Sequence, residues 1–180
     1  MLPSVTVLVP NYRHARYLPE RLDSILAQTV VPNEVLLLDD CSPDNSLSIL
    51  TAYAAERPSW RVVANEHNSG SPFAQWNKGV GLAAFDYVWI AESDDAADPL
   101  LLETLLQTAQ TNPSAVLVYA QTLLMDENSR TLHSFQQNYD YLFGARAVRW
   151  KESYFARGVD ELREYFLLHN VVPNASGALI

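Results

Sequence analysis

Short apolar runs alternate along the chain with stretches in which apolar residues recur at helical spacing. The runs are rich in Val, Leu and Ile and end in turn-forming residues, as buried strands do; they occupy residues 5–9, 34–38, 61–64, 86–91 and 115–120. Helices are predicted between them, over residues 16–28, from residue 42 or 44 to 53, over 73–84 and from residue 98 onward. The alternation predicts an α/β fold, with a mostly parallel sheet covered by helices on both faces.

The pattern weakens after residue 125. Residues 136–154 combine aromatic side chains with Arg146, Arg149 and Lys151. A helix is predicted over residues 158–168, and residues 170–180 are typical of a turn that enters a strand. We therefore expect one region over residues 1–125 and a second over 126–180. Because the last four residues are apolar or Gly, we also expect the natural protein to continue beyond Ile180.

The composition indicates an acidic globular domain. The chain has 180 residues, 48% of them hydrophobic, and 12 basic against 21 acidic residues give a net charge of −9. This balance argues against nucleic-acid binding, which needs a basic face. No apolar run approaches the roughly 18 residues of a membrane helix, and no basic leader precedes the first strand. Cys41 is the only cysteine, so an internal disulfide is excluded and a reducing, cytoplasmic location is predicted.

Three carboxylates directly follow the fourth predicted strand: Glu92, Asp94 and Asp95. Ligands bind parallel sheets at the carboxyl ends of their strands, and hard oxygen donors suit Mg²⁺ or Mn²⁺. A cation would also relieve the repulsion between neighbouring carboxylates. We therefore predict Mn²⁺ or Mg²⁺ as a cofactor at this position. The alternative is a solvated turn ahead of a helix that starts at Asp98.

Two further polar clusters follow predicted strands. Asp39 and Asp40 come after the second strand, where a carboxylate can accept hydrogen bonds from a nucleobase imide or a ribose hydroxyl. An ordinary β-turn explains the same composition. The loop that begins at Asn68 leads into a helix carrying Lys78, and its backbone donors could approach a diphosphate together with this ammonium group. The alternative is a plain connection between strand and helix.

Several other chemistries are not indicated. The sequence has no phosphate-binding Gly-rich loop ending in Lys-Ser/Thr, no Gly-x-Gly-x-x-Gly turn and no Gly-x-Ser-x-Gly elbow. ATPase, dinucleotide oxidoreductase and serine hydrolase activities are therefore not expected. The four histidines lack the spacing of zinc ligands, and Cys41 has no evident histidine partner, so none of these residues is given a role.

The strand ends carry motifs that together resemble the family 2 glycosyltransferases. In chain order, the motifs are Val5-Thr6-Val7-Leu8-Val9-Pro10-Asn11-Tyr12, Leu38-Asp39-Asp40-Cys41-Ser42-Pro43-Asp44, Asn68-x-Gly70, Gln75-Trp76-Asn77-Lys78-Gly79 and Trp89-Ile90-Ala91-Glu92-Ser93-Asp94-Asp95. The resemblance covers residues 4–125 and keeps the order and spacing of the motifs. It implies the GT-A fold, a Rossmann-like nucleotide-sugar-binding core over residues 1–125, followed by the start of an acceptor-side region over 126–180. Residues 170–176 are similar to the family segment that precedes the acceptor-side strand.

The resemblance also implies roles for individual residues. Those expected to bind the nucleotide are Pro10, Asn11, Tyr12, Asp39, Asp40, Asn68, Gly70, Asn77, Lys78, Ser93 and Asp94. Among them, Asp40 corresponds to the carboxylate that reads the base. The metal would be held among Glu92, Asp94 and Asp95, and the resemblance leaves open which of the three touches it. Two residues depart from the family pattern: Glu92 replaces the commoner Asp, which points to a supporting role, and Cys41 stands where Gly or Asn is usual.

The function implied by the resemblance is metal-assisted transfer of a sugar, with inversion, from a nucleoside-diphosphate sugar to an acceptor hydroxyl. Uridine is the family's commonest base, and the expected acceptor is a glycan or a lipid-linked glycan. We expect no nucleic-acid partner, no transmembrane segment and a cytoplasmic location, peripheral at the inner membrane face. The general base of inverting members is expected beyond Ile180, and Asp160 and Glu161, which precede that place, are not assigned to it.

Three alternatives stay open from the sequence. The chain could be a nucleotide-sugar-binding domain that is inactive at this length, since its catalytic base is not identified. It could be a nucleotidyltransferase, although these enzymes carry a basic Gly-rich loop where this chain has Pro10-Asn11-Tyr12-Arg13-His14. A protein-interaction domain would require residues 139–154 to form an exposed patch, whereas we expect that segment to line the acceptor side or the floor of the donor site.

Overall fold

A computed structural model describes residues 2–180 of the chain, which divide into two compact units. The first unit runs to Tyr119 and takes in Ala178–Ile180, and the second is Ala120–Gly177. This division lies six residues before the predicted start of the second region at residue 126. The reason is strand pairing, because the strand at Leu123–Met125 pairs with Thr131–Ser134 and not with the main sheet.

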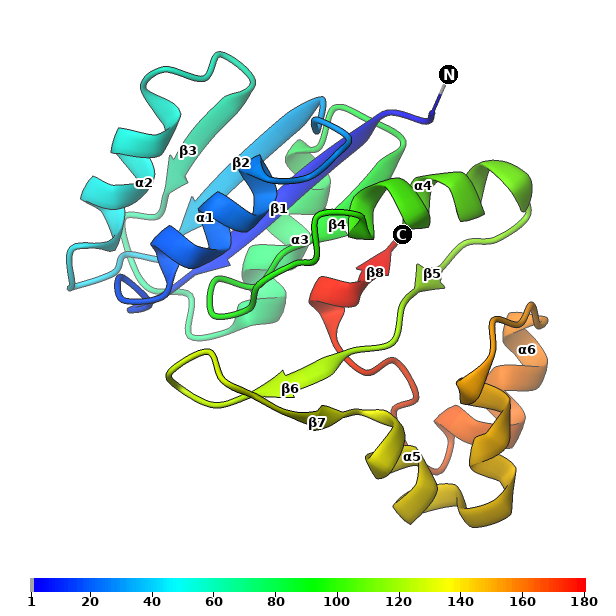
Figure 1. The fold of residues 1–180 in the computed structure, drawn as a ribbon. Coiled ribbons are helices and arrows are strands. Elements are labelled where there is room, and N and C mark those ends of the chain that lie inside the picture. Colours follow the sequence, from blue (N-terminus) through cyan, green and yellow to red (C-terminus); the bar gives the residue numbers. More distant parts are fainter. Residues whose placement is uncertain (1) are drawn as a thin grey trace. The chain divides into compact units, whose positions relative to one another are not determined.

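The first unit is built on a six-stranded sheet with the order β3-β2-β1-β4-β8-β5 (Figure 1). Its strands are β1 (Val5–Asn11), β2 (Glu34–Asp39), β3 (Trp60–Ala64), β4 (Tyr87–Ile90), β5 (Val118–Tyr119) and β8 (Ala178–Leu179). The first four run parallel, and β8 lies antiparallel between β4 and β5. All five predicted strands are confirmed, although the fifth is only two residues long.

Helices cover both faces of this sheet. They are α1 (Leu18–Leu26), α2 (Ser46–Ala54), α3 (Pro72–Leu82) and α4 (Leu101–Thr111), so each predicted helix is found. Leu8 and Leu38 point towards α3, where a Cβ atom added at Gly79 would lie 2.7 Å from Leu8 Cδ1. The guanidinium group of Arg21, on α1, lies over the ring of Trp89. Because Trp89 pairs with Val7, the strand neighbour of Leu8, α1 and α3 lie on opposite faces (Figure 1).

The second unit combines a hairpin with short helices. The hairpin pairs β6 (Leu123–Met125) with β7 (Thr131–Ser134). It leads into α5 (Gln136–Phe143), the 3-10 helix η1 (Gly144–Lys151), α6 (Gly158–Glu161), the π-helical turn η2 (Leu162–Phe166) and the 3-10 helix η3 (Ala175–Gly177). The helix predicted over residues 158–168 is therefore found as α6 and η2. The helices α5 and η1 were not predicted, because their many aromatic residues mask the helical period.

The aromatic residues of the second unit form its own core. Tyr139 stacks on Trp150 with ring centroids 4.3 Å apart, and its hydroxyl donates to the Val171 carbonyl over 2.7 Å. Tyr165 meets Trp150 edge to face. Within residues 139–154, Tyr139 and Trp150 are thus core residues, whereas Tyr141 and Val148 are 89% and 64% exposed. The segment therefore contributes both to this core and to the surface of the second unit.

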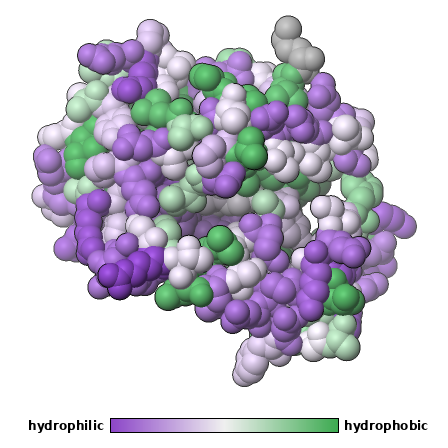
Figure 2. Space-filling view, viewed as in Figure 1, coloured by the Kyte–Doolittle hydropathy of each residue, from purple (hydrophilic) through white to green (hydrophobic). Residues whose placement is uncertain are grey.

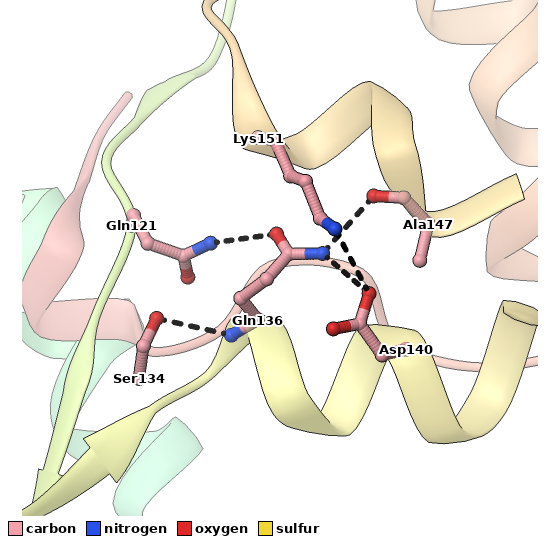
Figure 3. Close-up of polar contacts among 6 residues, drawn as sticks. All are labelled: Gln121, Ser134, Gln136, Asp140, Ala147 and Lys151. Carbon is pink, nitrogen blue, oxygen red and sulfur yellow. Dashed lines mark hydrogen bonds and ion pairs between the residues drawn. The ribbon is translucent and has the colours of Figure 1, made fainter. Parts of the chain in front are cut away.

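A polar cluster ties the hairpin of the second unit to its helices (Figure 3). The Gln136 side chain donates to Asp140 Oδ1 over 3.0 Å and to the Ala147 carbonyl over 3.1 Å, and it accepts from Gln121. The Gln136 backbone N–H donates to Ser134 Oγ over 3.2 Å. These hydrogen bonds join residues of the second unit to one another, so we assign the cluster a structural role.

Hydrophilic residues dominate the face of the molecule seen in Figure 2, with hydrophobic ones scattered among them. No helix within residues 2–180 combines the length and the apolar character that crossing a bilayer requires.

Candidate functional site

The polar clusters predicted at strand ends gather at one edge of the first unit's sheet. Strands β1, β2 and β4 are parallel neighbours, with Asn11 paired to Asp39 and Leu8 paired to Ile90. The residues that follow β2 and β4 therefore emerge on either side of the end of β1. This is the edge at which parallel sheets bind ligands.

Asn11 and Asp39 are hydrogen-bonded to each other at the centre of this edge. They are 2% and 1% exposed. The Asn11 amide donates to Asp39 Oδ1 over 2.9 Å and to Ser42 Oγ over 3.1 Å, and Asp39 Oδ2 accepts the Ser42 N–H over 3.0 Å. The Asn11 carbonyl Oδ1 is buried without a hydrogen-bond partner among the described residues. The neighbouring Pro10 is buried, whereas Tyr12 is 40% exposed.

Asp40 is a buried carboxylate with four hydrogen bonds. Oδ1 accepts from Asn65 Nδ2, the Ser69 N–H and Gln75 Nε2 over 2.6, 2.9 and 2.7 Å, and Oδ2 accepts from Ser69 Oγ over 2.7 Å. Burial by itself raises the pKa of Asp40, but these donors outweigh it and hold the pKa below its usual value. Asp40 thus anchors the loop that connects β3 to α3.

The same loop and the helix α3 that follows it carry the residues predicted to approach a diphosphate. Gly70 has a φ of +70°, and its N–H donates to Asn68 Oδ1 over 2.5 Å. The Lys78 ammonium donates to Asn65 Oδ1, so Asn65 links Lys78 to the Asp40 network. Asn77 is exposed on α3. The structure therefore joins Lys78 to Asp40 through one amide.

The acidic residues lie on a tight turn after β4. The Asp95 N–H donates to the Glu92 carbonyl over 3.2 Å and closes the turn. Asp94 is exposed, whereas Glu92 and Asp95 are half-buried. Ser93 is 1% exposed, with its hydroxyl 2.8 Å from His14 Nδ1. This arrangement leaves Asp94 as the carboxylate of the turn that is most open to solvent.

The half-buried side chain of Glu92 is held by a hydrogen bond from α3. Its Oε1 accepts the Trp76 indole N–H over 2.6 Å. Burial raises the pKa of Glu92 to about 7; the negative charges of Asp94 and Asp95 add to this, and the Trp76 bond and Arg21 oppose it. Glu92 is therefore less open to a metal ion than the exposed Asp94, and its supporting role stays a prediction.

The acidic turn suits a metal that takes most of its ligands from a substrate. Within residues 2–180, no group of three or more His, Cys, Asp or Glu side chains is arranged to hold a metal ion by itself. Mg²⁺ and Mn²⁺ need no such group, because one or two carboxylates together with substrate phosphates and water complete their coordination. Asp94, with Asp95 beside it, provides that kind of donor set.

The structure adds residues for which sequence reasoning found no role. Asn65, Gln75 and Trp76 support the predicted carboxylates, and His14 contacts Ser93. Gln75 and Trp76 lie inside one of the motifs on which the family resemblance is based. Arg21 was detectable in principle, because it is a charged residue on the apolar side of a predicted helix.

Comparison with known proteins bears out the resemblance. A sequence model described as "Glycosyl transferase family 2" matches residues 6–164. The glycosyltransferase GlyG of Streptococcus pneumoniae is 35% identical over 63% of the chain, and an uncharacterised glycosyltransferase of Nostoc, alr2836, is 30% identical over 71%. The chain spans 38% and 39% of the length of these two relatives.

Solved structures give the same result for the fold. Residues 1–349 of S. aureus TarS, in complex with UDP-GlcNAc, superpose with a TM-score of 0.61 at 27% identity, covering 72% of this chain and 36% of that one. The mannosyltransferase PcManGT of Pyrobaculum calidifontis, in complex with GDP-Man and Mn²⁺, has a TM-score of 0.57 at 24% identity, covering 70% and 36%. The fold of the first unit is thus the GT-A fold, and the chain belongs to glycosyl transferase family 2.

Proposed function

We propose that the chain binds a nucleoside-diphosphate sugar at the carboxyl edge of β1, β2 and β4 and serves its transfer, with inversion, to an acceptor hydroxyl. The observation that carries the proposal is the exposed Asp94, on a turn fixed beside the buried pair Asn11 and Asp39. Family membership supports sugar transfer as the reaction.

Each side chain has a distinct task in this proposal. Asp94, with Asp95, would hold Mn²⁺ or Mg²⁺, which when bound neutralises charge that builds up on the leaving nucleoside diphosphate. Lys78, which Asn65 joins to Asp40, would supply a positive charge beside the nucleoside, where the ribose leads to the diphosphate. Asp40 would accept the imide N–H of the base in place of Ser69, its exposed donor. The general base that takes the acceptor's proton is not assigned to a residue of this chain.

Uridine is the proposed nucleoside, and a glycan or lipid-linked glycan the proposed acceptor. The complex of TarS with UDP-GlcNAc supports the donor. Two relatives support the acceptor by their names: a chondroitin synthase of Pasteurella multocida, 31% identical over 66% of the chain, and the succinoglycan biosynthesis protein ExoO of Rhizobium meliloti, 31% identical over 65%. A lipid-linked acceptor would place the reaction at the inner face of the membrane.

A second candidate is donor binding without turnover by these 180 residues. The observation that favours it is the length of the aligned region, because the chain spans only about two fifths of the length of GlyG and alr2836. Turnover of UDP-sugars by this chain and by a longer form separates the two. A nucleotidyltransferase is disfavoured, because the family match covers residues 6–164.

The proposal is tested by thermal shift with a panel of nucleoside diphosphates, with and without Mn²⁺. We expect UDP with Mn²⁺ to raise the Tm of the wild type, since a ligand that binds only the folded state stabilises it. Asp94→Asn should lose the part of the shift that depends on Mn²⁺, with at least about tenfold weaker binding and a metal-free Tm close to wild type.

Asp86→Asn is the matched control, because Asp86 is an exposed carboxylate at the other end of β4. It should leave the UDP and Mn²⁺ shift unchanged. A wild-type Mn²⁺ titration in Asp94→Asn would refute the assignment of Asp94.

A further inference from the structure

Arg21 is a charged residue in the core of the first unit. It lies on α1 among the apolar residues Leu18, Leu22 and Ile25, and it is 0% exposed. Its Nε donates to the backbone carbonyl of Glu92 over 2.8 Å, and its guanidinium carbon lies 5.9 Å from the centroid of the Trp89 ring. A helix on one face of the sheet thus reaches the turn that carries the acidic residues.

The rest of the guanidinium group is unpaired. Nη1 and Nη2 are buried and have no hydrogen-bond partner among the described residues. An isolated charge in such a place is costly unless opposite charges lie near. Burial lowers the pKa of Arg21 to about 10, and the negative charges of Asp95, Asp94 and Glu92 act against that change. The charges of the acidic turn therefore favour the charged form of Arg21.

Glu92 is held from both faces of the sheet. Arg21 of α1 binds its carbonyl oxygen, and Trp76 of α3 binds its carboxyl group. The turn that follows is closed by a backbone bond from the Asp95 N–H to the Glu92 carbonyl. The same carbonyl oxygen therefore accepts both from Arg21 and from the turn that presents Asp94.

We propose that Arg21 is a positioning residue for the acidic turn. It fixes the Glu92 carbonyl, and its positive charge allows the carboxylates of the turn to stay close together before a metal binds. The part of this proposal that concerns metal rests on the proposed function, whereas the ordering of the turn does not.

The test compares Arg21→Met, which removes the charge, with Arg21→Lys, which keeps a charge but loses Nε. Arg57→Met is the control, because Arg57 is another arginine of the first unit that packs over Tyr53 and Trp60. Hydrogen exchange at the amides of residues 93–95 is measured in the metal-free protein. We expect exchange at least about tenfold faster in Arg21→Met, a smaller increase in Arg21→Lys and no change in Arg57→Met.

The second measurement is the affinity for Mn²⁺ in the presence of UDP, determined from the electron paramagnetic resonance signal of free Mn²⁺. Whether the substitution weakens or tightens Mn²⁺ binding separates two possible roles of Arg21. If Arg21 positions the turn, Arg21→Met binds Mn²⁺ about tenfold or more weakly. If it were only a nearby positive charge, its removal would tighten Mn²⁺ binding, and that result would overturn the proposal.

Exchange at the wild-type rate in both Arg21 variants would also overturn it. Should Arg21→Met not fold, Arg21→Lys decides. Because it keeps the charge but loses Nε, faster exchange with weaker Mn²⁺ binding supports positioning, and wild-type values in both measurements overturn it. A wild type that binds neither UDP nor Mn²⁺ would refute the proposed function, and the exchange rates would still decide the role of Arg21.

Discussion

At the scale of single residues, the turns beside the site depend on left-handed backbone. Cys41 has a φ of +58° and Arg13 a φ of +62°, and the Arg13 N–H donates to Ser42 Oγ over 3.1 Å. Glycine and asparagine adopt this conformation at lower cost than other residues. The Gly or Asn that the family resemblance leads us to expect at the position of Cys41 would suit this conformation, and here Cys41 adopts it.

Replacing Cys41 should therefore change stability according to backbone preference. We expect Cys41→Asn to raise the free energy of unfolding by about 0.5–1 kcal/mol, because asparagine tolerates a positive φ. Cys41→Val should lower it by about 1–2 kcal/mol, because a β-branched side chain is strained there. Urea denaturation of the three proteins measures both changes. Equal stabilities would contradict the left-handed turn.

Glu92 should make the metal-free protein less stable as the pH rises. Its pKa is raised from 4.5 to about 7 in the folded state, mainly by burial. Between these values the folded protein binds more protons than the unfolded chain, so stability is greatest below about pH 4.5 and falls until about pH 7.

Glu92→Gln, which has no such titration, should gain on the order of 1–2 kcal/mol over the wild type between pH 4.5 and 8, after allowance for partial exposure. Denaturation curves across this pH range measure the difference. Glu66→Gln is the control, since Glu66 is exposed. A constant difference between Glu92→Gln and wild type would refute the pKa assignment.

At the scale of elements, α3 packs closely on β1 and β2 because Gly79 has no side chain. A Cβ atom there would lie 2.7 Å from Leu8 Cδ1 and 2.8 Å from Leu38 Cδ1, and both leucines are fully buried. This contact brings Gln75, Trp76 and Lys78 of the same helix to the site edge. Gly81 lies two residues along the same helix, with nothing within 4 Å of an added Cβ atom.

The two glycines form a matched pair. Gly79→Ala should lower the free energy of unfolding by about 1–3 kcal/mol, since two buried leucine side chains must shift to admit the methyl group. Gly81→Ala should raise it by about 0.5–1 kcal/mol through helix propensity alone. Thermal and urea denaturation measure both. Stabilisation by Gly79→Ala would contradict the close packing of α3.

At the scale of the whole molecule, the negative charge is concentrated in the first unit. Residues 1–119 and 178–180 contain 14 acidic and 6 basic residues, a net charge of −8, whereas residues 120–177 contain 7 and 6. A diphosphate is itself anionic, so the unit proposed to bind it repels it at long range. A bound cation offsets this repulsion, which agrees with the proposed role of Asp94.

The order of strands and helices in the first unit could be predicted from the sequence, and so could the edge where the site lies. Both follow from local properties, namely the period of apolar residues and the turn chemistry at strand ends. Prediction was weaker in the second unit, where α5 and η1 pack around Tyr139 and Trp150 and aromatic residues mask the period. The shift of the unit boundary to Tyr119 depends on the pairing of β6 with β7, which no local pattern specifies.

By itself, then, the sequence determined the α/β fold and the three strand ends that carry Asn11, Asp39 and Glu92. Only the tertiary structure decided which carboxylates are buried, which are hydrogen-bonded and which are exposed. Asp40 is saturated by donors that lie 25 to 35 residues away, and Glu92 is bound by Arg21 from 71 residues away. Burial and hydrogen bonding depend on such distant neighbours, so the exposure of Asp94 and the buried charge of Arg21 follow from the fold and not from the motif.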